Sequence, residues 1–136
     1  MRKILVAIDG TAGSEKALEA AIRLAQRDGG QVAALAVLDR PADPHLERLA
    51  EAVKDRSRGL LEEVLQAAAN FARSRGVRLT PQLREGHPAE TIIACAEQEG
   101  AELLVLGANG AGRRPGLGGT ADQVSSHCPC TVMLVK

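Results

Sequence analysis

Short apolar runs alternate along the chain with longer segments in which apolar residues recur every three or four positions. Nearly continuous apolar runs of this length are typical of strands buried on both faces of a sheet. Runs 3–8 and 32–38 are of this kind, and the apolar runs 103–106 and 131–135 are expected to form the fourth and last strands. A fifth run, 77–84, alternates more between apolar and polar residues and is therefore expected nearer an edge of the sheet.

The segments between these runs have the periodicity of amphipathic helices. The first helix is expected to be capped by Ser14 with Glu15, after a turn-like segment at 9–13. In the long helical segment that follows the second strand, Gly59 could bend or interrupt the helix. A short helix is expected over 120–127.

Strands that alternate with helices imply a parallel sheet with right-handed crossovers and helices on both faces. We therefore predict one α/β domain, 1–136, with a doubly wound five-stranded parallel sheet in the order 3-2-1-4-5. Ligands of such sheets bind beyond the carboxyl ends of the strands, where the strand order reverses. Residues 9–11 and 107–110, which follow the first and fourth strands, are thus expected to line one crevice.

The loop after the fourth strand is dense in glycine. Residues 107–119 hold six of the 14 glycines of the chain. Such a loop can be a flexible connection, but between a strand and a helix it also lets backbone N–H groups approach an anion. Because this loop lies where the strand order reverses, an anion site is favoured over a flexible connection. The loop is not a P-loop, because no Gly-Lys-Ser/Thr occurs, and it breaks the dinucleotide fingerprint at the third glycine.

Composition excludes several classes of partner. Lys plus Arg and Asp plus Glu both total 17, so the chain lacks the basic character of a nucleic-acid-binding protein. Phe71 is the only aromatic residue, which also argues against a stacking platform for single strands. No apolar run approaches the roughly 20 residues of a membrane span, and the N-terminus lacks the features of a signal peptide. Three cysteines do not suggest a disulfide framework, so a cytoplasmic location is expected.

Three segments carry a resemblance to a known family: VAIDGT at 6–11, LVLGANG at 104–110, and ADQV followed by CPCTV within 121–132. With them, essentially the whole chain resembles the universal stress protein family. The resemblance implies a Rossmann-like fold. In the ATP-binding branch of that family the glycine loop reads Gly-x2-Gly-x9-Gly-Ser/Thr, and Gly107 and Gly110 match its first two glycines.

The second half of that pattern is shortened here. If Gly118 is the third glycine, Gly119 takes the hydroxyl position and the spacer has seven residues. If Gly119 and Thr120 form the Gly-Ser/Thr pair, the spacer has eight. Arg113 and Arg114 could supply charge that the shortened loop lacks, or could be solvated loop arginines.

The resemblance also implies a ligand and its site. Asp9 is expected to face the ribose or adenine, and Val37 to meet the adenine through its backbone. Residues 106–110 would line the ribose and phosphates, and 118–120 the phosphate tail. The ligand would be ATP or another adenine nucleotide, which Mg²⁺ could accompany. The predicted binding residues are Ala7, Ile8, Asp9, Thr11, Val37, Leu106, Gly107, Asn109, Gly110, Arg113, Gly118, Gly119 and Thr120.

Organised catalytic machinery is not visible in the sequence. Asp9-Gly10-Thr11 lacks the second acidic group that phosphotransferases with an Asp nucleophile need two residues on. There is no Gly-x-Ser-x-Gly elbow and no His-Glu-x-x-His pair. We therefore do not expect an enzyme, beyond slow incidental ATP hydrolysis.

His127, Cys128 and Cys130 place three soft ligands within four residues. They could begin a metal site, or the two thiols could be redox active. Pro129 fixes the chain between the cysteines, Cys130 is expected to open a buried strand, and no second ligand pair lies elsewhere. We therefore interpret both cysteines as structural and predict no metal site.

The resemblance implies a stress-response or regulatory protein that binds an adenine nucleotide and acts through conformation and dimerisation. The dimer is expected to form through the apolar edge strand 131–135, since unpaired backbone groups invite another strand; Lys136 and the neighbouring loop could instead keep that edge monomeric. The alternative is a dimeric interaction module of the same fold that does not bind nucleotide. An adenine-nucleotide hydrolase is disfavoured, because its Ser-Gly-Gly loop is missing after the first strand.

Overall fold

The computed structural model describes residues 2–39, 47–108 and 119–136, and only the backbone over 47–53. Five parallel strands form one sheet in the order β3-β2-β1-β4-β5, which confirms the predicted fold class. The strands are β1 (Lys3–Ala7), β2 (Gln31–Asp39), β3 (Leu79–Gly86), β4 (Leu103–Gly107) and β5 (Thr131–Val135).

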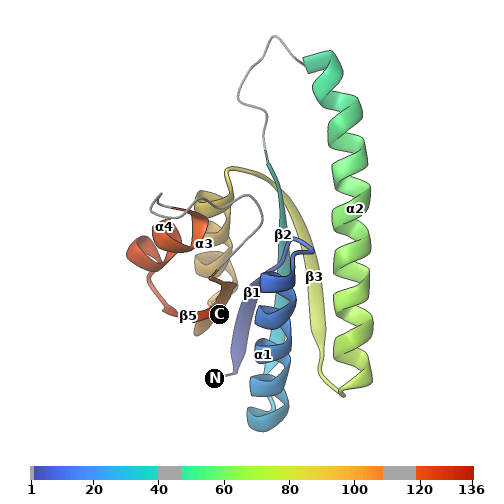
Figure 1. Ribbon diagram of the computed structural model, residues 1–136. Helices are drawn as coiled ribbons and strands as arrows, with labels where there is room; N and C mark the ends of the chain where they lie inside the picture. Colours follow the sequence, from blue (N-terminus) through green and yellow to red (C-terminus); the bar gives the residue numbers. More distant parts are fainter. Residues whose placement is uncertain (1, 40–46, 109–118) are drawn as a thin grey trace.

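Helices cover both faces of the sheet (Figure 1). On one face lie α1 (Ala12–Asp28) and the long α2 (Glu47–Ser74). On the other lie α3 (Pro88–Glu99) and the short α4 (Thr120–His127). The sheet thus has a separate hydrophobic core on each side.

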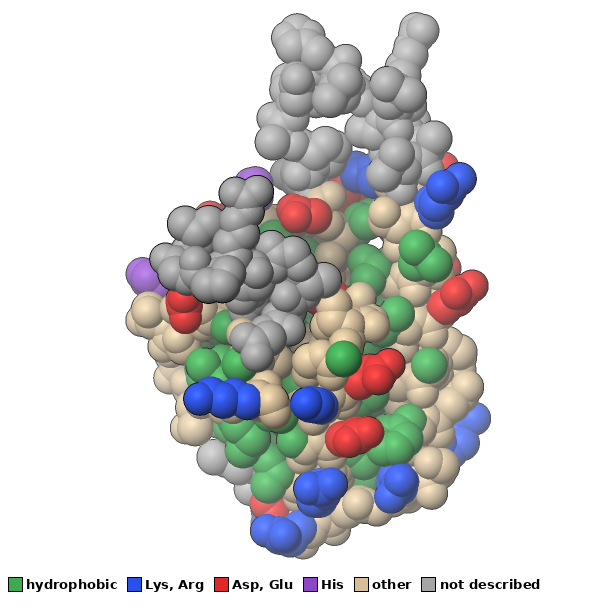
Figure 2. Space-filling model, viewed as in Figure 1, with side chains coloured by type: hydrophobic (Ala, Val, Ile, Leu, Met, Phe, Trp, Pro, Cys, Tyr) green, Lys and Arg blue, Asp and Glu red, His purple; other side chains and the backbone are tan. Residues whose placement is uncertain are grey.

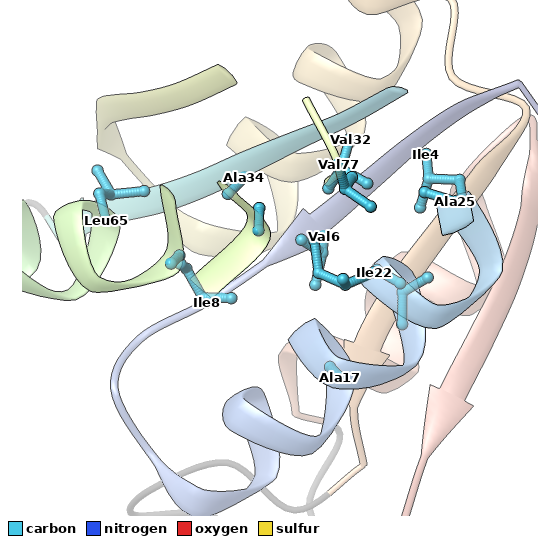
Figure 3. Close-up of a cluster of buried hydrophobic side chains, with 14 of the residues drawn as sticks. Ile4, Val6, Ile8, Ala17, Ile22, Ala25, Val32, Ala34, Leu65 and Val77 are labelled. Atoms are coloured by element: carbon cyan, nitrogen blue, oxygen red, sulfur yellow. The ribbon is translucent and has the colours of Figure 1, made fainter. Parts of the chain in front are cut away.

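The position of β1 at the centre of the sheet explains why its sequence is continuously apolar. Ile4 and Val6 point to the α1 side, where they meet Ile22 and Ala25 (Figure 3). Leu5 points to the opposite core. Because successive side chains of a strand alternate between faces, a strand covered on both sides needs apolar residues at every position.

Helix α1 begins earlier than predicted, so the expected cap at Ser14 is wrong. The helix starts at Ala12, and Thr11 is its N-cap. The Thr11 hydroxyl oxygen accepts the backbone N–H of Ser14 at 3.2 Å, which satisfies one of the free donors of the first turn. Ser14 itself is buried in that turn.

Of the two effects that the sequence suggests for Gly59, a bend or an interruption, the interruption does not occur in α2. The helix runs unbroken from Glu47 to Ser74, and the position of a Cβ on Gly59 faces open space. A single glycine costs a helix about 1 kcal/mol relative to alanine. Burial of residues such as Leu65 and Ala68 against the sheet outweighs that cost.

The two edge strands are β3 and β5. The expectation that 77–84 lies near an edge is therefore confirmed, although β3 starts at Leu79 because the Val77 N–H still donates to the Ala72 carbonyl at the end of α2. The expectation that β5 is buried is wrong. Its residues are half-buried or exposed, and Leu134 is 42% exposed.

Charged side chains are mixed in sign on the face that α1 covers. Figure 2 shows acidic and basic side chains interspersed there. Within the described residues, no helix is both long and apolar enough to cross a membrane.

Candidate functional site

A cavity of about 320 Å³ opens at the carboxyl ends of β1, β2 and β4, beside the first turns of α3 and α4. It lies where the strand order reverses between β1 and β4, which is the crevice predicted from the strand alternation. The residues that line it are Ala7, Ile8, Asp9, Thr11, Ser14, Leu35, Val37, Asp39, Pro88, Ile92, Leu106, Gly107, Thr120 and Ala121.

A closed set of hydrogen bonds holds the turn from β1 to α1. Asp9 Oδ1 accepts the Thr11 N–H at 3.0 Å and the Thr11 hydroxyl at 2.6 Å. The Ser14 hydroxyl accepts the Asp9 N–H at 3.2 Å and donates to the Thr11 carbonyl at 3.1 Å. Gly10 makes the bend with a left-handed φ of 87°. One oxygen of the Asp9 carboxylate is thus fixed by the turn, and this orients the carboxylate at the cavity.

Val37 lies on β2 beyond the last residue that pairs with β1, so its backbone has no neighbouring strand on that side. The last pair of the β1–β2 ladder is Ala7 with Leu35, followed by the Ile8 N–H donating to the Leu35 carbonyl at 2.9 Å. In a parallel ladder, the groups that face one neighbour recur at every second residue. The N–H and C=O of Val37 therefore point to the β1 side, into the cavity, while its neighbours Ala36 and Leu38 keep the ladder with β3.

Gly107 allows the first turn of α1 to lie directly against the end of β4. A Cβ at this position would lie 3.1 Å from the backbone nitrogen of Ser14 and closer still to the carbonyl of Gly13. The glycine therefore has a packing role in addition to the binding role implied by the sequence. It brings the start of α1 to the wall of the cavity.

The remaining predicted residues divide into two groups. Those that the structure brings to the cavity are Ala7, Ile8, Asp9, Thr11, Val37, Leu106, Gly107 and Thr120. Gly119 is the N-cap of α4 and directly precedes Thr120, without lining the cavity itself. Asn109, Gly110, Arg113 and Gly118 lie outside the described residues.

Several lining residues were missed by the sequence analysis. Leu35 and Asp39 flank Val37 at two-residue spacing and share its face of β2, so the strand period alone could have found them. Pro88 and Ile92 lie one helical turn apart at the start of α3. Their contribution depends on how α3 sits over the sheet, and no local motif signals that.

The cavity carries two carboxylates, Asp9 and Asp39, and no Lys or Arg among its described lining residues. The thiols and carboxyls with shifted pKa values lie elsewhere. Burial raises the pKa of the Cys95 thiol and raises that of Cys130 to about 11. A hydrogen bond from Gln82 lowers the pKa of Glu99. In the described part of the chain, no three His, Cys, Asp or Glu side chains are grouped so that they could hold a metal ion.

A sequence model of the universal stress protein family matches residues 1–136. The chain belongs to this family. A universal stress protein from Methanocaldococcus jannaschii, MJ0531, is 31% identical over 143 residues that cover 99% of this chain and 82% of that protein. The family membership stated as a resemblance from segments 6–11, 104–110 and 121–132 is therefore confirmed.

Solved structures of universal stress proteins share the fold. UspA from Lactobacillus plantarum superposes with a TM-score of 0.90 at 26% identity and covers 99% of this chain and 97% of its own. A universal stress protein in complex with cAMP has a TM-score of 0.80 at 21% identity, with 99% and 97% covered. The Archaeoglobus fulgidus protein in complex with dAMP has a TM-score of 0.75 at 22% identity, with 100% and 98% covered. At these last two identities the likeness concerns the fold alone.

Proposed function

We propose that this universal stress protein binds an adenine nucleotide in the cavity at the ends of β1, β2 and β4. The observation that carries the proposal is the backbone of Val37, whose N–H and C=O face the cavity beyond the last pair of the β1–β2 ladder. The amino-pyrimidine edge of adenine offers one acceptor and one amine donor. A backbone N–H and C=O on the same residue complement both.

The walls of the cavity suit the flat faces of a base. Leu35, Ile92 and Leu106 supply aliphatic surface, and Phe71, the one aromatic residue of the chain, is not among the lining residues. Apolar walls with a few placed polar groups are the usual composition of a small-molecule site. A volume of about 320 Å³ is at the lower end of such sites.

Asp9 is the proposed partner of the ribose. An ionised carboxylate is a hydrogen-bond acceptor only, so it suits the hydroxyl donors of a ribose. The turn engages Oδ1 of Asp9 through Thr11, which leaves Oδ2 without a hydrogen-bond partner among the described residues. The carboxylate would therefore be oriented before the ligand arrives, which reduces the entropic cost of binding.

The start of α4 is the proposed contact for the phosphates. Thr120 is the first residue of the helix and lines the cavity, and its N-cap Gly119 makes no side-chain capping bond. The backbone N–H groups of a first helical turn have no partner within the helix, and together with the helix dipole they favour an anion at this end. Two solved relatives of the same fold were obtained with cAMP and dAMP, which supports an adenine nucleotide as the ligand class.

We also propose that the bound nucleotide acts as a regulatory ligand of a homodimer and is not a substrate turned over at ordinary rates. Purified protein should therefore hydrolyse ATP far more slowly than the roughly 10 per second of a typical enzyme. Turnover in that range, abolished by one substitution in the cavity, would overturn the regulatory proposal.

The proposed dimer contact is the outer edge of β5. The Ala108 N–H donates to the Val135 carbonyl at 2.8 Å, so Val135 faces β4 and the alternate residues Val132 and Leu134 direct their backbone groups outward. Leu134 also exposes its side chain. A second copy could pair with this edge antiparallel across a two-fold axis.

The experiment that tests nucleotide binding is acid extraction of the purified protein, followed by calorimetric titration of the nucleotide-free protein with ATP, AMP and GTP. We expect adenine nucleotide in the extract and saturable binding of at least one adenine nucleotide. An empty extract together with no heat of binding for ATP or AMP would instead favour the interaction module that lacks nucleotide.

A further inference from the structure

Two thiols meet in the turn that connects α4 to β5. Cys128 Sγ lies 3.4 Å from Cys130 Sγ, within hydrogen-bond contact for sulfur. Both residues are half-buried and therefore partly open to solvent. The structural interpretation of these cysteines depends partly on a buried strand after Cys130. That strand, β5, is half-exposed, so this argument no longer holds.

The chain geometry allows these sulfurs to approach further. Residues two apart are separated by at most about 7 Å between Cα atoms, and disulfides span roughly 4.4–6.8 Å. The backbone bends at Pro129 and Cys130, which shortens the separation below that of an extended chain. Closing the sulfur distance to the roughly 2.0 Å of a disulfide is then a local movement of two side chains.

A metal site fits these residues less well. The Nδ1 atom of His127 lies 3.0 Å from the carbonyl oxygen of Gln123 on its own helix, which leaves Nε2 as the one ring nitrogen for a metal, and no three His, Cys, Asp or Glu side chains of the described residues are grouped to hold one. Cys95, the third thiol, is a residue of α3 and is fully buried in the core between that helix and the sheet. The described residues provide only the two thiols at this turn, and two neighbouring thiols suit disulfide exchange.

We propose that Cys128 and Cys130 form a redox pair that closes to an intrachain disulfide by exchange with a low-molecular-weight disulfide. The thiolate of one cysteine attacks one sulfur of that disulfide, forming a mixed disulfide and releasing one small thiolate, which takes up the proton that this cysteine lost. The other cysteine then gives up its proton and attacks the protein sulfur of the mixed disulfide, and the second small thiol leaves with that proton. The protein dithiol is oxidised by two electrons, and the small disulfide is reduced to two thiols.

Burial, followed by the hydrogen bond with Cys128, raises the pKa of Cys130 to about 11, so Cys130 is held as a thiol at neutral pH. The bond would tie the end of α4, whose first residue Thr120 lines the cavity, to the start of the exposed edge strand β5.

The test uses the full chain, reduced and then incubated with excess glutathione disulfide. After an acid quench, the protein is denatured, alkylated and digested with trypsin. The C-terminal peptide contains Cys128 and Cys130 but not Cys95. We expect this peptide unlabelled and two hydrogens lighter than its reduced form, and fully labelled again after dithiothreitol. Cys95→Ser should behave in the same way.

Two variants test the mixed-disulfide step. Cys130→Ser and Cys128→Ser should each accumulate a glutathione adduct on the remaining thiol of the turn, because neither variant can close the disulfide. The proposal is overturned if wild-type protein in excess glutathione disulfide is labelled at both cysteines, keeps a glutathione adduct without closing, or forms the bond between two chains. Absence of a glutathione adduct from both variants would overturn the exchange step.

Discussion

The backbone of Gly13 lies against Gly107 with no space for a side chain between them. A Cβ atom at position 107 would lie 2.7 Å from both the carbonyl carbon and the carbonyl oxygen of Gly13. This approach joins the end of β4 to the first turn of α1, and both segments border the cavity. The width of the candidate site is therefore set partly by a backbone contact.

Gly107→Ala should loosen this contact, because backbone atoms cannot rotate out of the way of a methyl group. We expect the free energy of unfolding to fall by about 1–3 kcal/mol, as for other overpacked positions, measured by urea denaturation. The matched control is Gly59→Ala, where the new methyl meets open space on a helix and should stabilise by up to about 1 kcal/mol. Equal stability of Gly107→Ala and wild type would contradict the close approach.

The pH dependence of stability should contain a contribution from Glu99. Its carboxylate accepts a hydrogen bond from Gln82 and pairs with Lys3 at 3.1 Å, and these contacts hold its pKa below the ordinary 4.5. A lowered pKa in the folded state stabilises the fold above the unfolded value, and this stabilisation is lost as the pH falls below about 4.5.

Glu99→Gln should therefore lose less stability than wild type on acidification below pH 4.5, in thermal unfolding followed by circular dichroism. Glu97→Gln is the control, because it removes an exposed carboxylate from the same helix. Parallel pH profiles for wild type and Glu99→Gln would show that the contacts with Gln82 and Lys3 do not favour the charged form.

Dimer formation through β5 should respond to a proline at its outward-facing positions. Val132→Pro removes an N–H that points away from β4, so the ladder within the protein is kept. We expect wild type to be a dimer at micromolar concentration in light scattering and Val132→Pro to shift toward monomer. Val132→Ala, which keeps the N–H, should remain dimeric. Monomeric wild type would exclude this interface.

The fold could be predicted because the hydrophobic pattern of each strand and helix follows from which of its faces is buried. A strand such as β1, buried on both faces, requires apolar residues at Ile4, Leu5 and Val6, and this pattern differs from that of the helices. The site could be located as far as it depends on strand order, since Asp9 and Gly107 directly follow the two strands where that order reverses.

Other features depend on contacts that a linear pattern does not contain. Ser14 resembles a helix cap in sequence, but Thr11 takes that role because its hydroxyl reaches both Asp9 and the Ser14 N–H. Pro88 reaches the cavity only because α3 crosses above β2. The contact between Cys128 and its partner thiol requires the bend after α4, which the sequence indicates only as a proline.

The proposed role of Val37 rests on two backbone groups, so a substitution that removes one of them is the sharpest probe. Val37→Pro removes the N–H that faces the cavity, while Ala36 and Leu38 continue to pair with β3. Val37→Ala keeps the N–H and shortens only the side chain. Thermal unfolding of both variants establishes that each is folded before titration.

The most direct measurement is calorimetric titration of wild type, Val37→Ala and Val37→Pro with ATP and AMP. Loss of one hydrogen bond to the base, about 1.4 kcal/mol, should weaken binding by Val37→Pro about tenfold relative to Val37→Ala. Equal affinities of the two folded variants would contradict adenine recognition by the Val37 backbone. Absence of binding by wild type itself would contradict the cavity as a nucleotide site.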